Sequence, residues 1–409
     1  MKKDRIFTNI NEQGSVTLKA SQKRGDWKDV QEILEKGPQW VRDQISESEF
    51  RERSGHGEYV AKKWAQGKFP YLVINACGNE PGTGIDRYLL RHEPHKILEG
   101  CFWVAHALEV HTCYICIRGD YSQEREILEA ALLECFENNL LGDLKIHLHI
   151  GAGGAICGED SALLESLEGR KAIPRGTPDQ KLYGCLSIVH NLETVATIPT
   201  LLRQGALWFS SLGTSKSKGT KLFSLSGHVG TPCVVEEEMG ISFKDLIEKQ
   251  GGDVRGGWEF LLAAIPGGAS SGFLPKESCE ELTLDFESLE AASSCLGTGG
   301  IVVFDQSTDI VRIAVRLAQF YKQESCGKCT PCRVGTGWVS HLLDRLGVGR
   351  AKVEELDELQ EVLRRMADTS LCSFGAWAAA PIESLLRYFR PELEQRIKLY
   401  EMASRREKI

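Results

Sequence analysis

The sequence lacks any long apolar run. Across 409 residues, no uncharged stretch approaches the roughly 18 apolar positions that a membrane-spanning helix requires. Residues 1–7 carry basic side chains, but no apolar segment follows them, so they do not resemble a secretory signal. We therefore expect no direct membrane span and a cytoplasmic location.

The sequence also lacks a strong excess of charge. Charged residues make up 26% of it and the net charge is -8, which is typical of a globular protein and favours neither disorder nor nucleic-acid binding. We expect no nucleic-acid partner. The length is sufficient for about two to four domains, each with its own core.

Cysteine is plentiful, with 14 residues in a chain that shows no secretory signal. In a reducing compartment, scattered cysteines serve as small apolar residues and clustered ones bind metal. Three of them, Cys326, Cys329 and Cys332, follow one another with two residues between each. This spacing lets one tight loop direct three thiolates at one point, as in iron-sulfur proteins.

A fourth ligand is available in Cys372, which is the only cysteine downstream of Cys332 and lies in a short break between two helical stretches. Zinc is the alternative, since four thiolates also suit tetrahedral zinc. Structural zinc usually uses two separated cysteine pairs, so the pattern favours an iron-sulfur cluster. A disulfide is disfavoured by the absence of a secretory signal.

Hydrophobic periodicity divides the chain into four regions. We predict a helical cap with a glycine-containing loop in residues 1–65, a doubly wound α/β domain in 66–215, a compact β-grasp-like unit in 216–307 and a helical bundle in 308–409. The cysteine loop falls between the first two helices of the bundle, and Cys372 falls between the third and fourth. An antiparallel arrangement would bring both to one end.

The α/β domain contains predicted strands at 71–75, 112–118 and 144–150, joined by helical crossovers. A parallel sheet of this kind binds ligands at the carboxyl ends of its strands. Residues 150–161 hold four glycines between a strand and a helix, which suits contact with an anion or cofactor. The acids Glu159 and Asp160 favour a polyhydroxylated group; alternatively, they stabilise the helix N-terminus through its dipole.

An earlier loop, in residues 50–64, contains Ser54, Gly55 and Gly57 between basic residues. Glycines allow backbone NH groups to approach an anion, so this loop is a candidate phosphate cradle. A flexible surface loop is the alternative interpretation.

Four segments together carry a family resemblance: residues 324–338, 151–169, 226–228 (Ser-Gly-His) and 256–258 (Gly-Gly-Trp). With them the chain resembles the NADH-binding flavoprotein subunit (the F type) of respiratory complex I, and its relatives in NAD-linked hydrogenases and formate dehydrogenases. The resemblance implies a Rossmann-like FMN-binding domain, a β-grasp domain of the SLBB type and a C-terminal four-helix bundle that carries a 4Fe-4S cluster.

The resemblance also implies an activity, in which NADH gives a hydride to FMN and electrons leave singly to the 4Fe-4S cluster. The implied cluster ligands are Cys326, Cys329, Cys332 and Cys372. The implied cofactor-facing residues, with Glu80 as a candidate catalytic residue, are Gly55, Gly57, Lys63, Asn75, Glu80, Gly158, Glu159, Asp160 and Asn191. The implied partners are other iron-sulfur subunits, including a thioredoxin-like 2Fe-2S subunit, which would hold the chain at the inner membrane.

The nucleotide loops depart from the family pattern. Where the family has Gly-Arg-Gly-Gly-Ala-Gly-Phe-Pro-Thr-Gly, residues 52–61 are Glu-Arg-Ser-Gly-His-Gly-Glu-Tyr-Val-Ala, and His190 takes the place of an asparagine. The loop at residues 75–82 lacks two of the family's acids. Carboxylates at Glu52 and Glu58 would repel a dinucleotide pyrophosphate. An alternative function is therefore a non-catalytic paralogue that keeps the cluster for electron transfer or scaffolding but has lost NADH binding, with or without FMN.

Overall fold

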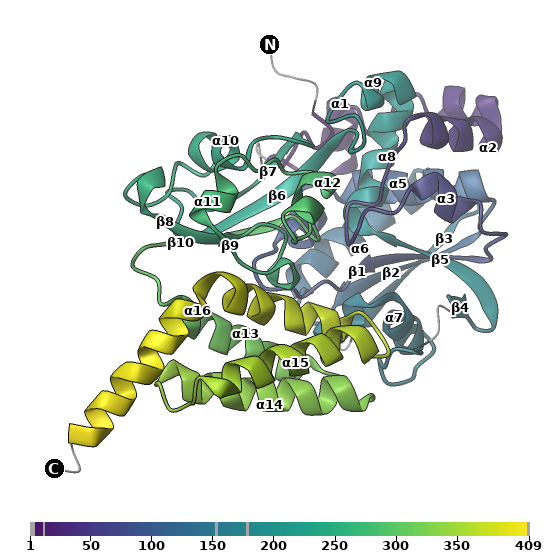
Figure 1. The fold of residues 1–409 in the computed structure, drawn as a ribbon. Helices are drawn as coiled ribbons and strands as arrows, with labels where there is room; N and C mark the ends of the chain where they lie inside the picture. Colours follow the sequence, from purple (N-terminus) through teal and green to yellow (C-terminus); the bar gives the residue numbers. More distant parts are fainter. Residues whose placement is uncertain (1–4, 11–12, 152–153, 177–179, 407–409) are drawn as a thin grey trace.

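Two β-sheets and a helical bundle make up the molecule in the computed structural model, which describes residues 5–10, 13–151, 154–176 and 180–406 (Figure 1). Ala152 and Gly153 of the predicted glycine-rich loop lie outside the described residues. No helix in the described ranges combines the length and apolar character needed to cross a bilayer.

The first sheet has the strand order β3-β2-β1-β5-β4. Its strands are β1 (Tyr71–Ala76), β2 (Thr112–Arg118), β3 (Lys145–Gly151), β4 (Lys181–Leu182) and β5 (Cys185–Asn191). β1 pairs in parallel with both β2 and β5, and β2 pairs in parallel with β3, whereas β4 is antiparallel to β5. The three predicted parallel strands are confirmed. β5 was not predicted, and it completes the edge where ligands are expected.

Helices cover both faces of this sheet, which is why β1 is apolar at successive positions rather than at alternate ones. These helices are α4 (Ile85–His92), α5 (Pro94–Leu108), α6 (Ser122–Glu137), α7 (Asp160–Leu167), α8 (Leu192–Gln204) and α9 (Ala206–Ser210). The N-terminal helices are α1 (Leu18–Arg24), α2 (Val30–Glu47) and α3 (Val60–Trp64). α8 begins at Leu192 because Asn191 caps it, accepting a hydrogen bond from the Glu193 amide.

The second sheet has the order β7-β6-β10-β8-β9 and is mixed, because β6 and β10 run in parallel while the other pairs are antiparallel. Its strands are β6 (Thr220–Gly227), β7 (Cys233–Glu238), β8 (Leu261–Ile265), β9 (Leu274–Pro275) and β10 (Gly300–Asp305). Its helices are α10 (Phe243–Lys249), α11 (Lys276–Cys279) and α12 (Phe286–Ala291). This arrangement agrees with the predicted β-grasp-like unit.

The C-terminal bundle consists of α13 (Ile310–Glu324), α14 (Thr330–Gly347), α15 (Glu354–Thr369) and α16 (Phe374–Arg406). α16 consists of two helical segments joined across a kink at Phe389, where the backbone leaves helical geometry two residues before Pro391. The end of α16 extends away from the rest of the molecule, as its yellow ribbon shows (Figure 1). The cysteine loop joins α13 to α14, and Cys372 lies between α15 and α16, as predicted.

Candidate functional site

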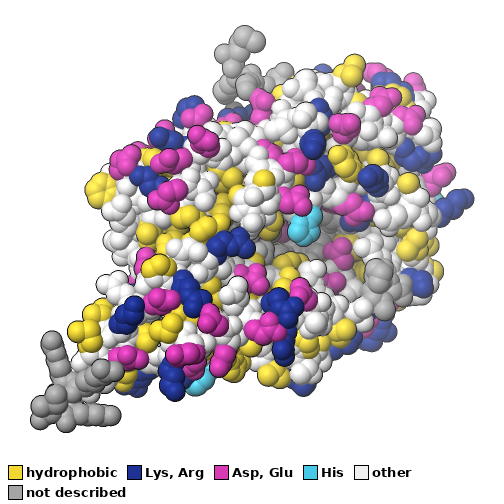
Figure 2. All heavy atoms as spheres, viewed as in Figure 1, with side chains coloured by type: hydrophobic (Ala, Val, Ile, Leu, Met, Phe, Trp, Pro, Cys, Tyr) yellow, Lys and Arg dark blue, Asp and Glu magenta, His cyan; other side chains and the backbone are white. Residues whose placement is uncertain are grey.

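A pocket of about 570 Å³ lies where the three units meet. A hollow between the bundle and the two sheet units is visible near the middle of the face in Figure 2. Its lining includes residues 52–58, Lys63, Asn75, Gly78, Asp86, Gly158, Asp160, His190, Asn191, Glu193, Thr298, Ser373 and Trp377. Asn75 and Asn191 stand at the carboxyl ends of the neighbouring strands β1 and β5, where a parallel sheet places its ligands.

Most of the residues expected to face a cofactor line this pocket: Gly55, Gly57, Lys63, Asn75, Gly158, Asp160 and Asn191. Glu80 and Glu159 do not. The Glu80 carboxylate accepts a hydrogen bond from the Ser270 amide at 2.6 Å, so it ties the turn after β1 to the second sheet unit.

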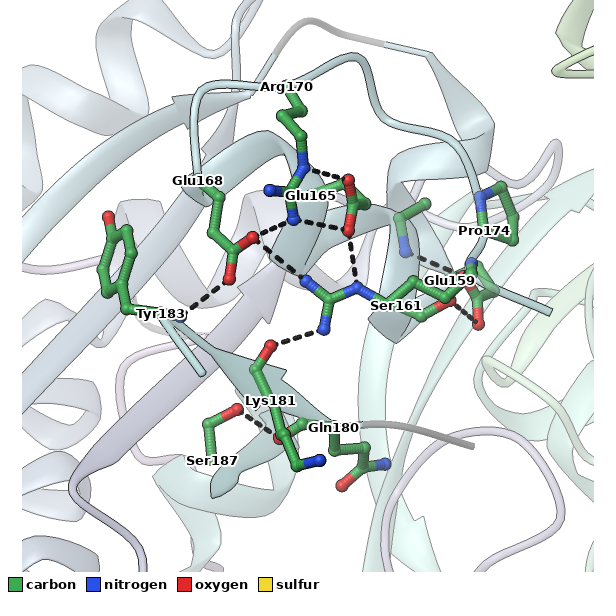
Figure 3. A network of polar contacts seen from close by, with 12 residues as sticks. Glu159, Ser161, Glu165, Glu168, Arg170, Pro174, Gln180, Lys181, Tyr183 and Ser187 are labelled. Carbon is green, nitrogen blue, oxygen red and sulfur yellow. Dashed lines mark hydrogen bonds and ion pairs between the residues drawn. The ribbon is translucent and has the colours of Figure 1, made fainter. Parts of the chain in front are cut away.

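Glu159 and Asp160, adjacent in sequence, have different surroundings. Glu159 is the N-cap of α7 and accepts hydrogen bonds from the Ala162 amide at 2.9 Å and the Ser161 hydroxyl at 2.7 Å (Figure 3). The helix-terminus alternative therefore describes Glu159, whereas Asp160 lines the pocket.

Asp86, Ser373 and Trp377 are among the lining residues that were not predicted from the sequence. The available signal for Asp86 was an acid in the first turn of a helix that follows a strand-end loop. Ser373 and Trp377 carried no such signal, because they belong to the bundle and reach the pocket only through the packing of distant segments.

The loop at residues 52–58 has the geometry of an anion cradle. Gly55 and Gly57 have left-handed φ values of 59° and 65°. Within the described chain, the amide NH groups of Ser54, Gly55 and His56 make no hydrogen bond to protein, so they are available to a ligand. Consecutive free NH groups of this kind suit a phosphate.

Two asparagines hold the opposite side of the pocket in place. Asn75 accepts a hydrogen bond from the Cys77 amide and donates one to the Gly158 carbonyl at 3.0 Å, which joins the loop after β1 to the loop after β3. Asn191 uses its side-chain oxygen to cap α8, so its NH₂ group is the part available to a ligand.

Glu52 does not act as the free repulsive charge that we expected. Its side chain is buried, and Lys63 donates to it at 3.1 Å. Burial raises the pKa of the Glu52 carboxyl, but the Lys63 ammonium and further hydrogen-bond donors outweigh burial and hold the pKa far below its usual range. Glu58, by contrast, is exposed at the mouth of the loop.

The four cysteines predicted as ligands come together at one end of the bundle. Burial raises the pKa of the Cys332 thiol, and the nearby sulfurs of Cys329 and Cys326 raise it further. The sulfurs of Cys326 and Cys332 likewise lie close enough to Cys372 to raise its pKa. The Ser325 hydroxyl lies 3.2 Å from the Cys332 sulfur. Burial, together with Glu159 and the neighbouring thiols, raises the pKa of Cys372 to about 11. A hydrogen bond from the Phe374 backbone amide lowers this pKa but does not outweigh burial. A bound metal would favour its thiolate form.

In the part of the chain that the structure describes, no group of three or more His, Cys, Asp or Glu side chains is arranged to hold one metal ion. The thiolates that bind a 4Fe-4S cluster each bind a different iron atom, so they stand further apart than the ligands of one zinc ion.

The cysteine loop packs directly on the strand-end loops of the first sheet. The Glu324 carboxylate accepts a hydrogen bond from the Ala155 amide at 2.5 Å, and the Lys328 ammonium donates to the Pro174 carbonyl at 2.7 Å. The pocket and the cysteine site are therefore parts of one packed region rather than separate sites.

Ion pairs fix the segment that receives Lys328. Arg170 pairs with Glu165 and Glu168, and Arg175 pairs with Glu165 at 2.6 Å, so residues 168–175 are held against α7 (Figure 3). Pro174 lies within this segment.

Three family profiles match consecutive parts of the chain. Residues 45–200 match the Nuo51 FMN-binding domain, 221–313 match the SLBB domain, and 312–396 match the NADH-ubiquinone oxidoreductase-F iron-sulfur binding region. The chain is 48% identical over 414 residues to the NADH-quinone oxidoreductase F subunit of Rickettsia bellii (strain OSU 85-389), and the match covers 97% of this chain and 99% of the relative. The corresponding protein of Rickettsia typhi (strain ATCC VR-144 / Wilmington) is 47% identical over 417 residues, with 98% and 99% covered.

The chain belongs to the family of NADH-quinone oxidoreductase F subunits. The fold is also similar to a chain of an NAD+-reducing NiFe hydrogenase in the H2-reduced state, with a TM-score of 0.82 and 32% identity. That match covers 88% of this chain but only 63% of the hydrogenase chain, so this chain spans less than two thirds of that neighbour. Nothing in these matches points to a loss of activity, so the non-catalytic alternative gains no support from them.

The residues present fit the two cofactors of this family. The free amide groups of residues 54–56 suit the phosphate of FMN, while Asp160 and the Asn191 amide suit its hydroxyl groups and ring edge. The cavity is within the usual size range for a cofactor site. The four converging cysteines match the 4Fe-4S region, and the zinc alternative has no support from the comparisons.

Proposed function

We propose that this chain oxidises NADH at the pocket and delivers electrons to other iron-sulfur subunits through its cysteine site. The observation that carries the proposal is that the pocket lining extends to Ser373, the residue next to Cys372. The pocket, as the site of two-electron oxidation, would thus lie directly beside the cysteine site, which accepts electrons singly. Bound FMN would supply the conversion between two-electron and one-electron transfer.

Each group of residues would have a distinct task. The amides of residues 54–56 would bind the flavin phosphate, Asp160 would accept from a ligand hydroxyl, and the Asn191 amide would donate to the ligand. Trp377 would cover the bundle side of the pocket and exclude water. Glu80 and Glu159, which lie outside the lining, would act by holding the loops in position.

We further propose that the chain works within a multisubunit complex, docked beside a thioredoxin-like 2Fe-2S subunit. The matched relatives are named as subunits, which supports assembly of this kind. The chain would lie in the cytoplasm, at the inner membrane through its partners.

The proposal is tested by adding NADH to the anaerobically purified holoprotein. We expect the flavin absorbance to bleach, followed by the electron paramagnetic resonance signal of a reduced 4Fe-4S cluster. Cys372→Ala should lose the cluster signal and most of its iron, because Cys372 would be a cluster ligand. The flavin that the variant retains should still bleach, because hydride transfer from NADH takes place at the flavin and does not need the cluster. Cys185→Ala, which changes an exposed cysteine at the start of β5, is the matched control.

Two results would refute the proposal. One is a purified protein that carries the cluster but neither retains FMN nor binds added FMN. The other is bound flavin that chemical reductant bleaches and NADH does not.

A further inference from the structure

The Glu52 carboxylate lies at the centre of a buried network beneath the anion cradle. One of its oxygens accepts hydrogen bonds from the Lys63 ammonium at 3.1 Å and from the His190 ring at 2.5 Å, and the other accepts from the Thr194 hydroxyl at 2.7 Å. Glu52 is 5% exposed and His190 is 0% exposed. A carboxylate with several buried donors is fully satisfied and held in one position.

The partners of His190 determine its proton positions. The Trp64 indole NH can only donate, and it lies 2.9 Å from His190 Nε2, so this nitrogen accepts. The ring proton is therefore on Nδ1, where it is donated to Glu52. His190 is neutral in this arrangement, and the negative charge of Glu52 is balanced by Lys63.

Glu52 and His190 are both departures from the family pattern, which has glycine and asparagine at these positions. They lie 138 residues apart in the chain but are hydrogen-bonded in the fold. A glycine at position 52 alone would leave Lys63 without its carboxylate partner. An asparagine at position 190 alone would remove the ring nitrogen that accepts from the Trp64 indole and the ring NH that donates to Glu52. The two departures therefore behave as one matched replacement.

This replacement changes the charge of the pocket. With glycine at position 52, the Lys63 ammonium would lose its hydrogen-bonded carboxylate partner, and its positive charge would be compensated less. In this chain, Glu52 neutralises it, and Asp160 and Glu58 also act on it. The other lining acids come from further elements: Asp86 on α4, and Glu193 on α8, which pairs with Lys221 at 3.0 Å. A bound anion therefore meets a less positive environment.

We propose that Glu52 and His190 are paired positioning residues that hold Lys63 in a neutralised state and thereby make the reduction potential of the bound flavin more negative. This inference rests on the proposed binding of FMN. Reduction adds negative charge to the flavin, and a nearby positive charge would favour the reduced form. Neutralising Lys63 removes that preference and so makes electron release to the cluster more favourable.

The test compares Glu52→Gln and the double variant Glu52→Gly/His190→Asn with the wild-type holoprotein in anaerobic redox titrations. In both variants, the affinity for reduced FMN divided by the affinity for oxidised FMN should be higher than in the wild type. A tenfold change in that ratio corresponds to a rise of about 30 mV in the two-electron midpoint potential. Glu58→Gln is the matched control, since it removes the same charge from an exposed position on the same loop, where solvent screens it. We expect a smaller shift in this control.

A second measurement does not require flavin. Melting temperatures of the flavin-free wild type, Glu52→Gly, His190→Asn and the double variant form a double-mutant cycle. Each single change should lower the melting temperature, and the double variant should lose less than the sum of the two. Additive losses would overturn the matched pair, and a midpoint shift in Glu52→Gln no larger than that in Glu58→Gln would overturn its electrostatic role. If the wild type bound no FMN, the proposed function would fail while this cycle would still decide whether the pair is coupled.

Discussion

At the scale of single residues, two buried charges, Lys221 and Glu52, are each compensated by neighbouring polar groups. Lys221 is fully buried between the Glu193 carboxylate and the Arg53 carbonyl, and the Glu52 carboxylate is similarly surrounded by donors. Removing one partner of such a pair leaves an unpaired charge in a low-dielectric region, which is strongly destabilising. Asp86 differs, since it lines the pocket and, among the residues that the structure describes, no ion pair to it is found, although Lys221 and Arg118 lie near enough to act on it.

Asp86 should make stability depend on pH. Burial and the nearby Glu193 raise the pKa of Asp86 from 3.8 to about 7. The folded protein then keeps the Asp86 proton up to about pH 7, whereas the unfolded chain loses it near pH 4. Because the unfolded state binds fewer protons in this window, stability should fall as pH rises from about 4 to about 7.

Asp86→Asn should abolish this part of the pH dependence. From pH 5 to pH 8, the free energy of unfolding of the variant should rise relative to that of the wild type, by on the order of 1–2 kcal/mol after allowance for water in the pocket. Urea denaturation measures this difference, and the melting temperatures should change in the same direction. Asp143→Asn, at an exposed loop position, serves as control. Parallel curves for wild type and Asp86→Asn would contradict the assignment.

At the scale of elements, the anion cradle is held by the second sheet unit. Arg51 pairs with Glu287 of α12 at 2.6 Å and donates to the Gly57 carbonyl at 2.6 Å. The Phe286 ring, at the start of the same helix, covers Gly57 so closely that a Cβ there would lie 2.3 Å from the ring. The position of the loop therefore depends on α12 as well as on its own glycines.

Gly57→Ala should consequently disturb the cradle more than Gly55→Ala. Both positions have left-handed φ values, but a Cβ at Gly55 meets nothing within 4 Å. We expect a loss of about 1–2 kcal/mol for Gly55→Ala from backbone strain alone, and a further loss of about 1–3 kcal/mol for Gly57→Ala from overpacking against Phe286. Urea denaturation and FMN retention would be measured for both. Equal effects would show that α12 does not constrain the loop.

At the scale of the whole molecule, the cysteine loop joins the bundle to the flavin-binding unit. Glu324 and Lys328 both bond to backbone groups of that unit, and Ser373 and Trp377 form part of the pocket wall. The cluster should therefore stabilise the pocket as well as the bundle end, since metal binding and local folding are coupled.

Removing iron with a chelator should expose this coupling. Hydrogen exchange should accelerate in residues 324–332 and 370–377, and also in residues 154–176 of the flavin-binding unit, and FMN affinity should fall. The central strands β6 and β10 of the second sheet should be unchanged and serve as an internal control. Faster exchange confined to the bundle would show that the two sites are mechanically independent.

The sequence was sufficient to predict features that depend on local periodicity. β1, β2 and β3 were found because buried parallel strands are short apolar runs. β5 was missed because its polar residues His190 and Asn191 interrupt the apolar pattern, and only pairing with β1 shows that it is a central strand.

The sequence by itself determined the spacing of the four cysteines, the order of the units and the family, because each depends on residue spacing or local composition. The tertiary structure alone decided the charge state of the pocket. Glu52 appeared repulsive when considered by itself, and its neutralisation required Lys63, His190 and Thr194 to meet from separate segments. Electrostatic interactions depend on distance and burial in space, and separation along the chain specifies neither.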